Sequence, residues 1–410
     1  MTQVGAARED TERARRDKVQ QALVVMLLST LVLTLLGVLM VFSATAPASI
    51  GLVDADPTQR LFSIAIRQMI WSVAGIFFGI ILAMIPYTFT RRYAHLFLAL
   101  GCLLQAGVLL QGGEGANGNN NWLHLGPVVI QPSEFLKLAM IVWLAHMLAR
   151  LQLEEIKNLR TLVIPGLGFT IAVGLVAAGQ DMGTAIIYAL IAIGMFWLAG
   201  MRGWHMLSLL FVAGVATGVL LLSKPSRIRR VGEFISGLFT LPDIDSPTQT
   251  DYAQFAFGSG GLTGVGIGAG KEKWRDLSEA HTDFIYAVIG EELGLFGVVT
   301  VIVLFLALGW ALIRIAMYHQ DRYAQLLAIG ALLWLCGQAL SNMCVVTGLL
   351  PVFGVPLPFV SMGGSSMIAT LMMVGCVSAC ALGVPGVKDS WRVRGRLAQG
   401  VRTLVRRKQS

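Results

Sequence analysis

The sequence predicts an all-α polytopic membrane protein with about ten transmembrane helices and a large extracytoplasmic loop between helices 7 and 8. Of its 410 residues, 55% are hydrophobic and only 13% are charged, whereas a soluble protein carries about 25% charged residues. The apolar residues form runs of about 20, which is the helix length that crosses a hydrocarbon core about 30 Å thick. Backbone amides in lipid must be paired within their own segment, so these runs are helices.

The ten spans follow one another along the chain with mostly short connections. We expect them at residues 20–44, 61–86, 94–111, 132–150, 161–179, 183–200, 203–223, 284–313, 325–347 and 363–383. The first run is much longer than the apolar core of a cleaved signal peptide, and no small-residue cleavage site follows it cleanly. We therefore predict one membrane domain over residues 20–385 and no soluble domain.

The basic residues predict the orientation of the chain. An even number of spans places both termini on one side, and most of the 31 Lys and Arg residues flank the spans on that side. Short cytoplasmic loops carry the excess of Lys and Arg, so residues 1–19 and 386–410 are expected to be cytoplasmic tails. The basic C-terminal tail is expected to touch anionic lipid, which explains the net charge of +8 without a nucleic acid.

Three outward-facing connections are candidates for function. Residues 112–131 and 224–282 are long, and residues 346–362 are rich in Pro and Gly. Long loops in compact proteins are usually functional or disordered. Because polar residues concentrate at the span ends that border these loops, we expect the chemistry at the outer face.

Residues 279–294, EAHTDFIYAVIGEELG, gather ionisable side chains just where an apolar span begins. They include one histidine and four carboxylates, at Glu279, His281, Asp283, Glu291 and Glu292. Ionisable residues at a span end are functional candidates. A helix starting near Thr282 would also use Thr282 or Asp283 as a cap. Capping is an equally good interpretation for Thr282, but it does not explain the whole cluster.

Further charges lie inside or beside the spans. In QPSEFLK, Glu134 and Lys137 are three residues apart on one helical face. They either form a structural ion pair or leave Lys137 to contact an anion in a polar cavity. Arg67 is a second intramembrane cation, and Asp181 interrupts the chain between two spans. Two cations with several carboxylates opening toward one face indicate an amphiphilic anionic ligand.

The segment PLPFVSMGGSS, residues 356–366, precedes the last span. Its glycines allow a close approach of the backbone, and the free amides of a helix N-terminus attract phosphate. The alternative is a re-entrant loop buried in protein. A nucleotide site is not expected, because GLTGVGIGAGKEK has Glu272 where a P-loop needs Ser or Thr, and GVGIGA lacks a βαβ unit.

Four motifs in order resemble the SEDS family, the shape, elongation, division and sporulation membrane proteins of bacteria. They are NGNNNWLHLGPVVIQPSEFLKLA, GQDMGT, GSGGLTGVGIGAGKEKWRDLSEAHTDFIYAVIGEELG and NMCVVTGLLPVFGVPLPFVSMGGSS. The resemblance covers about residues 20–385, and the form of the third motif is closer to the division members than to the elongation members. Asn121, Gln180, Met182 and Ser278 depart from the usual family pattern, whereas HTDF does not.

The resemblance implies a peptidoglycan glycosyltransferase that polymerises lipid II at the outer face of the cytoplasmic membrane, at the division septum. It places the catalytic aspartate on Asp283. Substrate contacts are expected from Trp122, Arg67, Gln131, Glu134, Lys137, Asp181, His281, Thr282, Ser361, Gly363, Gly364 and Ser365. It also implies a divalent cation, Mg²⁺ or Mn²⁺, without a nucleotide or organic cofactor.

The partners implied are a single-span class B penicillin-binding protein with transpeptidase activity and other division proteins. Three alternatives remain open at this point. They are an elongation polymerase, a flippase that carries lipid II across the membrane, and a division scaffold whose catalytic residues are vestigial. A flippase predicts polar residues continuing into the cytoplasmic half, and the sequence does not have them. The intact HTDF argues against the scaffold.

Overall fold

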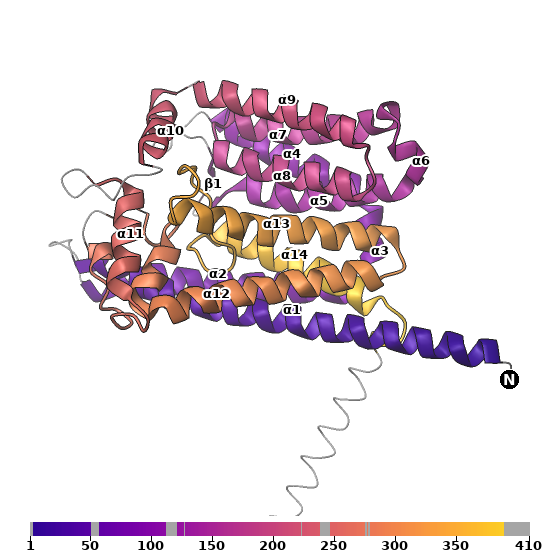
Figure 1. Cartoon of the computed structure of the whole chain (residues 1–410), viewed down its shortest axis with the longest axis horizontal. Helices are drawn as coiled ribbons and strands as arrows, with labels where there is room; N and C mark the ends of the chain where they lie inside the picture. Colours follow the sequence, from indigo (N-terminus) through magenta and orange to yellow (C-terminus); the bar gives the residue numbers. More distant parts are fainter. Residues whose placement is uncertain are drawn as a thin grey trace, which may run out of the picture.

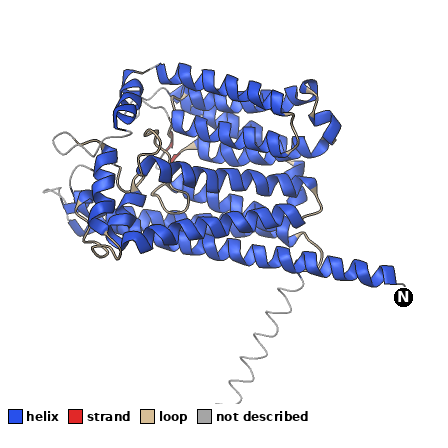
Figure 2. Cartoon of the chain, viewed as in Figure 1, coloured by secondary structure: helices blue, strands red, loops and turns tan. Residues whose placement is uncertain are grey.

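The computed structural model describes residues 3–50, 57–111, 121–126, 128–222, 224–237, 247–274, 277 and 279–388. Within these ranges the chain is a bundle of long helices that lie nearly parallel (Figure 1), and helix dominates throughout (Figure 2). The described residues contain one small sheet, in which β1 (Leu123–Leu125) pairs antiparallel with β2 (Val128–Ile130). The predicted all-α membrane class is confirmed.

The long helices match the predicted spans closely. They are α1 (Gln3–Ile50), α2 (Pro57–Met84), α4 (Ala94–Gln111), α5 (Pro132–Arg150), α7 (Val163–Ala178), α8 (Met182–Leu198), α9 (Gly203–Leu222), α12 (Ile285–Tyr318), α13 (Arg322–Val346) and α14 (Gly364–Leu382). Among the described residues, eight helical segments are long and apolar enough to cross a membrane, and α8 and α9 provide two shorter apolar helices. The number ten therefore stays a prediction.

Two boundaries differ from the expectation. α1 has 48 residues, about 72 Å at 1.5 Å per residue, so residues 3–19 continue the first span as helix. α12 begins at Ile285, after Asp283, and bends at Gly294, whose φ of 65° is non-helical. The predicted tail beyond Lys388, residues 112–120 and 127 of the first outer loop, and residues 238–246, 275–276 and 278 of the second lie outside the described residues.

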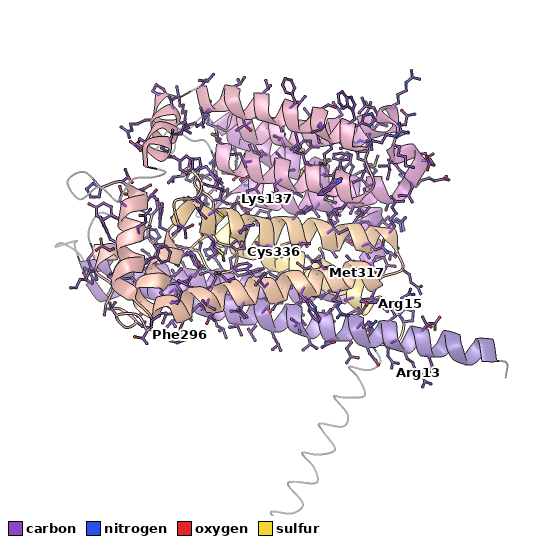
Figure 3. The ribbon with its side chains drawn as sticks, in the orientation of Figure 1. Arg13, Arg15, Lys137, Phe296, Met317 and Cys336 are labelled. Atoms are coloured by element: carbon purple, nitrogen blue, oxygen red, sulfur yellow. The ribbon has the colours of Figure 1, made fainter. Side chains whose placement is uncertain are left out.

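The centre of the bundle consists of α14, α5 and α13. In the apolar window of α14, 89% of the residues are buried, against 72% for α5 and 22% for α4. Glycines bring α14 against α2, because a Cβ at Gly375 would lie only 2.3 Å from the carbonyl oxygen of Gly79. Figure 3 shows Lys137 within the bundle and Phe296 pointing outward from it.

The short elements divide between the two ends of the bundle. α10 (Pro225–Gly237), α11 (Gln249–Gly260) and the β1 hairpin lie at one end, away from the N-terminus (Figure 1). α3 (Tyr87–Arg92) and α6 (Leu153–Ile156), which is followed by the 3₁₀ turn η2 (Leu159–Leu162), lie at the opposite end. The connections predicted to face outward thus meet at a single end, and the site described below opens there.

Candidate functional site

A cavity of about 1550 Å³ lies at the end of the bundle that carries α10, α11 and the β1 hairpin, which we call the loop end. Residues far apart in the sequence line it, from α2, α8, α10, α11, α13 and the turns that precede α12 and α14. Of the residues expected to serve catalysis or substrate binding, ten line the cavity: Arg67, Trp122, Gln131, Asp181, His281, Thr282, Asp283, Gly363, Gly364 and Ser365.

The backbone around Asp283 is held from one side by buried polar groups. Three successive carbonyl oxygens accept hydrogen bonds: that of His281 from the Met362 amide at 2.9 Å, that of Thr282 from Ser361 Oγ at 2.6 Å and that of Asp283 from Asn342 Nδ2 at 2.7 Å. These bonds tie the turn to α13 and to the loop before α14. The position of Asp283 is therefore fixed by its main chain.

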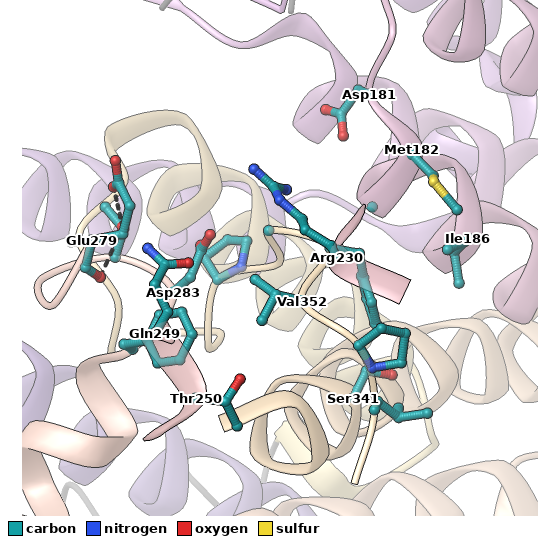
Figure 4. Close-up of a pocket in the computed structure, with 18 of the residues that line it drawn as sticks. Asp181, Met182, Ile186, Arg230, Gln249, Thr250, Glu279, Asp283, Ser341 and Val352 are labelled. Atoms are coloured by element: carbon teal, nitrogen blue, oxygen red, sulfur yellow. Dashed lines mark hydrogen bonds between the residues drawn. The ribbon is translucent and has the colours of Figure 1, made fainter. Parts of the chain in front are cut away.

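The Asp283 carboxylate itself is not engaged in this network. Within the described part of the chain nothing donates a hydrogen bond to it, and the side chain points into the cavity near Arg230 (Figure 4). Burial is the largest cause that raises its pKa to about 7, followed by the negative charges of Glu279 and Asp181, while Arg230 opposes the shift. Removal from water disfavours the charged form. Asp283 is thus poised to take up a proton near neutral pH.

Glu279 shapes the turn that carries Asp283. Its φ of 59° is unusual for a residue with a side chain, and such conformations are concentrated at functional sites. The Thr282 hydroxyl donates to Glu279 Oε2 at 2.6 Å. The pKa of His281 is lowered by burial, partly offset by Glu279, which favours the neutral imidazole.

Asp181 faces the cavity from the N-terminus of α8. Its Oδ1 accepts from the Thr184 amide at 3.0 Å as an N-cap, and its Oδ2 accepts from Gln131 Nε2 at 3.4 Å. Burial raises its pKa, while the hydrogen bonds from Thr184 lower it. The backbone N–H of Gln131 donates to Ser365 Oγ at 2.9 Å, which joins the cavity wall around Asp181 to the start of α14.

The predicted glycine turn closes the cavity beside α2. The Gly363 amide donates to Gln68 Oε1 at 3.4 Å, and a Cβ at Gly364 would lie 2.8 Å from the ring of Trp71. Only glycine allows so close a packing there. Arg67 from α2 and Trp122, which is 47% exposed, complete this wall.

Glu134, Lys137 and Ser361 do not line the cavity. Lys137 Nζ pairs with Glu134 Oε1 at 2.9 Å, with both side chains 1% exposed, and it donates to Gln338 Oε1 at 3.1 Å. Of the two interpretations of QPSEFLK, the geometry favours the structural ion pair. Ser361 is buried and contacts the backbone of the Asp283 turn, so its role is to position that turn.

Glu291 and Glu292 are also separate from the cavity, since each is only 1% exposed. Glu292 pairs with Lys273 and accepts from Ser43 Oγ of α1 at 2.7 Å. Glu291 accepts from the amides of residues 271 and 272. The acidic cluster of residues 279–294 thus divides into a cavity group and a pair that anchors the preceding loop.

Two parts of the cavity were not anticipated. α10 contributes Arg227, Arg229 and Arg230, and a run of arginines in a loop predicted to face outward contradicts the usual cytoplasmic bias. This unexpected run of arginines was the feature of the sequence that could have identified α10 as part of the site. Asn342 supports Asp283 from the last turns of α13, and a buried amide in an apolar span predicts a hydrogen-bonding role.

The described residues do not contain a group of three His, Cys, Asp or Glu side chains that would hold a metal ion. Mg²⁺ is usually held by one or two carboxylates together with substrate phosphates, so Asp181 and Asp283 alone do not make a preformed site. The expected divalent cation stays a prediction, and no chemical step below depends on it.

Comparison with known proteins gives one consistent result. Residues 23–382 match the family described as cell cycle protein FtsW/RodA/SpoVE. The chain is 36% identical over 349 residues to the stage V sporulation protein E of Bacillus subtilis, covering 84% of this chain and 93% of that protein. It is 37% identical over 358 residues to a probable peptidoglycan glycosyltransferase FtsW of Geobacter metallireducens, covering 86% and 92%.

A probable peptidoglycan glycosyltransferase FtsW of Mycobacterium tuberculosis is 35% identical over 354 residues, covering 85% of this chain. The chain spans 66% of that protein's length, slightly less than two thirds.

Two solved structures share the fold. The crystal structure of the rod shape determining protein RodA of Thermus thermophilus superposes with a TM-score of 0.62 at 25% identity, covering 87% of this chain and 95% of that one. A chain from a peptidoglycan synthase complex, studied for its coordination of polymerization and crosslinking, gives 0.66 at 26% identity, covering 85% and 97%.

Proposed function

This chain belongs to the FtsW/RodA/SpoVE family of cell cycle proteins, and from that premise we propose that it is a peptidoglycan glycosyltransferase that polymerises lipid II. The observation that carries the proposal is the position of Asp283. Its carboxylate faces a cavity of about 1550 Å³ at the loop end of a membrane bundle, and its pKa is raised to about 7. A general base works best when its pKa is close to the working pH.

The reaction joins a sugar hydroxyl to an anomeric carbon that carries an undecaprenyl diphosphate. Asp283 takes the proton of the attacking 4-hydroxyl, while the new glycosidic C–O bond forms and the bond from the anomeric carbon to the diphosphate oxygen breaks. The electron pair of that bond leaves with the diphosphate. Attack from the face opposite the leaving group inverts the anomeric configuration, so one base is sufficient.

The walls of the cavity suit the remaining parts of such a substrate. Arg67 offers a positive charge that would stabilise the departing diphosphate electrostatically, and the exposed ring of Trp122 can stack on a sugar face. Lys137 was also predicted from the sequence to contact an anionic substrate, but it is buried and forms an ion pair with Glu134. We therefore assign it no contact with substrate.

We further propose that both termini are cytoplasmic and that the protein works at the division septum beside a class B penicillin-binding protein. The loop end of the bundle holds the cavity, which supports an extracytoplasmic reaction. The division-type names of several relatives support the septal role, and the peptidoglycan synthase complex among the similar structures supports a crosslinking partner.

A lipid II flippase would need a polar route through the bundle. The cavity is lined by residues at the loop end, and the charged pair deeper in the bundle, Glu134 and Lys137, is closed to it. Liposomes that carry lipid II on one leaflet separate the two activities. Scrambling of lipid II without polymer would favour the flippase over the polymerase.

The direct test replaces Asp283 by asparagine in the purified protein with its transpeptidase partner, and follows glycan chains made from lipid II. We expect polymer formation to fall by about 10²–10⁴-fold, because the base that accepts the proton is gone. The matched control, Glu279→Gln, removes one negative charge from the same turn and should retain most activity. Polymer at the wild-type yield with Asp283→Asn would remove this residue from the mechanism.

A further inference from the structure

The basic surface of α10 is unusual for an outward connection. Lys224, Arg227, Arg229 and Arg230 fall within seven residues at the start of this helix, and all four line the cavity. Lys and Arg are normally concentrated on the cytoplasmic side of a membrane protein. A positive cluster held over a cavity at the opposite end of the bundle therefore indicates an anion that binds there.

The structure fixes α10 against this wall. Arg227 Nη2 donates a hydrogen bond to the carbonyl oxygen of Gln180 at 2.6 Å. Gln180 adopts a positive φ of 64° in the turn between α7 and α8, immediately before Asp181. Arg227 is thus only partly exposed, and its guanidinium is held beside the polar corner that contains Asp181.

Arg230 lies one helical turn beyond Arg227 and extends into the space between Asp181 and Asp283 (Figure 4). The pKa of Arg227 is lowered, first by burial and then by the like charge of Arg230, while the negative charge of Asp181 raises it. An anion that binds to both guanidinium groups would relieve their mutual repulsion. Arg229 differs, because its Nε pairs with Glu233 Oε1 of the same helix at 3.3 Å.

We propose that Arg227 and Arg230 form the diphosphate-binding wall of the cavity and receive the leaving group of the transfer reaction, an assignment that rests on the proposed function. The guanidinium fork binds phosphate oxygens through paired, charge-assisted hydrogen bonds. Leu221, Val231 and Phe234 line the cavity beside these arginines. A charged head with an apolar continuation matches a polyprenyl diphosphate.

The assignment also fixes where the leaving group binds relative to Asp283, the proposed base. Asp283 acts on the attacking hydroxyl, and Arg230 lies between it and Asp181. The leaving diphosphate is therefore received by the α10 wall, with Arg67 of α2 as a second cation of the same cavity. Arg230 also lowers the pKa of Asp283, so an anion bound to Arg230 would raise the affinity of Asp283 for the proton that it accepts.

The test measures binding of geranylgeranyl diphosphate to the full-length protein in nanodiscs of zwitterionic lipid. We expect Arg227→Gln and Arg230→Gln each to raise the Kd about 10-fold, and the double variant more, because each removes a charge-assisted contact. Arg229→Gln on the same helix should change the Kd less than 3-fold, since Glu233 already neutralises it. Arg160→Gln, exposed in η2 at the other end of the bundle, should leave the Kd unchanged.

A second arm distinguishes the sources of phosphate. Geranylgeranyl monophosphate and vesicles of phosphatidylglycerol compete with the probe, and the diphosphate should be preferred over both. Equal competition by phosphatidylglycerol would identify a lipid headgroup site and overturn the proposal. Arg230→Lys keeps the charge without the fork and should give an intermediate Kd, which a purely structural role of Arg230 would not produce.

The two proposals can fail separately. If the wild-type protein polymerises lipid II and the double variant binds the diphosphate normally, the α10 assignment is wrong and the glycosyltransferase stands. If the wild-type protein binds the diphosphate through Arg227 and Arg230 but makes no polymer, the binding wall stands and the proposed function is wrong. In the polymerisation assay, the double variant should lose turnover while Arg160→Gln keeps it.

Discussion

At the scale of single residues, Asp283 and Lys137 show that two ionisable side chains in one apolar bundle can have very different surroundings and roles. Asp283 has its backbone fixed by three hydrogen bonds and its carboxylate directed into a cavity. Lys137 is 1% exposed and is neutralised by Glu134 one turn away. The same rule, that ionisable residues in membranes are functional candidates, selected both of them. Only the packing distinguishes Asp283, the proposed base, from the structural pair of Lys137 and Glu134.

The raised pKa of Asp283 predicts the pH dependence of the reaction. A base must be deprotonated, so polymerisation should rise with pH through about 7 and level off above it. Because Glu279 raises this pKa, Glu279→Gln should move the acid limb to lower pH. Initial rates over pH 5.5–8.5 measure both profiles. An acid limb that is unchanged by Glu279→Gln would contradict the assignment of the limb to Asp283.

The same pKa has a consequence for stability. The folded-state pKa of Asp283 lies above its ordinary value of 3.8, so the unfolded chain loses this proton first and the fold loses stability as pH rises from 3.8 to about 7. Asp283→Asn should therefore unfold at a higher temperature than the wild type at pH 8, by a free energy of at most about 4 kcal/mol. The difference should shrink as pH falls below 7 and vanish at about pH 3, where Asp283 is protonated in both the folded and the unfolded chain.

Lys137→Met tests the structural interpretation of the buried pair. Removing one partner leaves Glu134 buried and uncompensated, which should destabilise the protein by about 3–5 kcal/mol. Adding Glu134→Gln should recover much of that loss. Thermal unfolding in detergent measures both changes. A single variant that keeps its stability and loses only turnover would instead return Lys137 to the substrate site.

At the scale of elements, the entry to α12 explains why one short stretch contains so many carboxylates. Asp283 serves the cavity, whereas Glu291 and Glu292 hold the loop of residues 261–274 against α12 and α1. The loop also pairs with the bend at Gly294, because the amide of Leu295 donates to the carbonyl of Gly261 at 2.9 Å. The motif that imitates a P-loop is therefore a packing segment.

The bend at Gly294 provides a prediction about this element. Gly294 has a positive φ of 65°, and a Cβ there would lie 2.3 Å from the Gly264 amide nitrogen. Gly294→Ala should therefore lower the thermal unfolding temperature, since left-handed strain alone costs about 1–3 kcal/mol. Gly166→Ala in α7, where a Cβ would meet nothing within 4 Å, is the matched control. Equal unfolding temperatures for the two variants would contradict the tight packing.

The positions of the long helices could be predicted from the sequence. The set of residues that line the cavity could be predicted only in part. The bounds of α5 agree with the predicted span at both ends, because Pro132 starts it and apolar periodicity carries it to Arg150. The cavity residues of α10 were not predictable from periodicity. That helix is short and polar, and its position over the site depends on Arg227 reaching the α7–α8 turn, a contact between segments 47 residues apart.

At the scale of the whole molecule, the arrangement of the ends predicts the topology. The cavity, α10 and α11 lie at one end, and η2 and the N-terminus lie at the other (Figure 1). Ser236→Cys in α10 should react with a membrane-impermeant maleimide in cells whose cytoplasmic membrane is intact and whose cell envelope outside that membrane has been made permeable. Arg160→Cys in η2 should react only after the cytoplasmic membrane is opened, with the unmodified chain as the blank. The reverse labelling pattern would invert the assigned orientation.

The way in which Asp283 is held has one more consequence. Three of the bonds that hold it are accepted by main-chain carbonyls, from Met362, Ser361 and Asn342, and none of the three involves the carboxyl group that ionises. A proton can arrive at and depart from the carboxyl group without breaking any of these three bonds. In the proposed polymerase, repeated turnover along a growing strand therefore requires no rebuilding of the site between one sugar and the next.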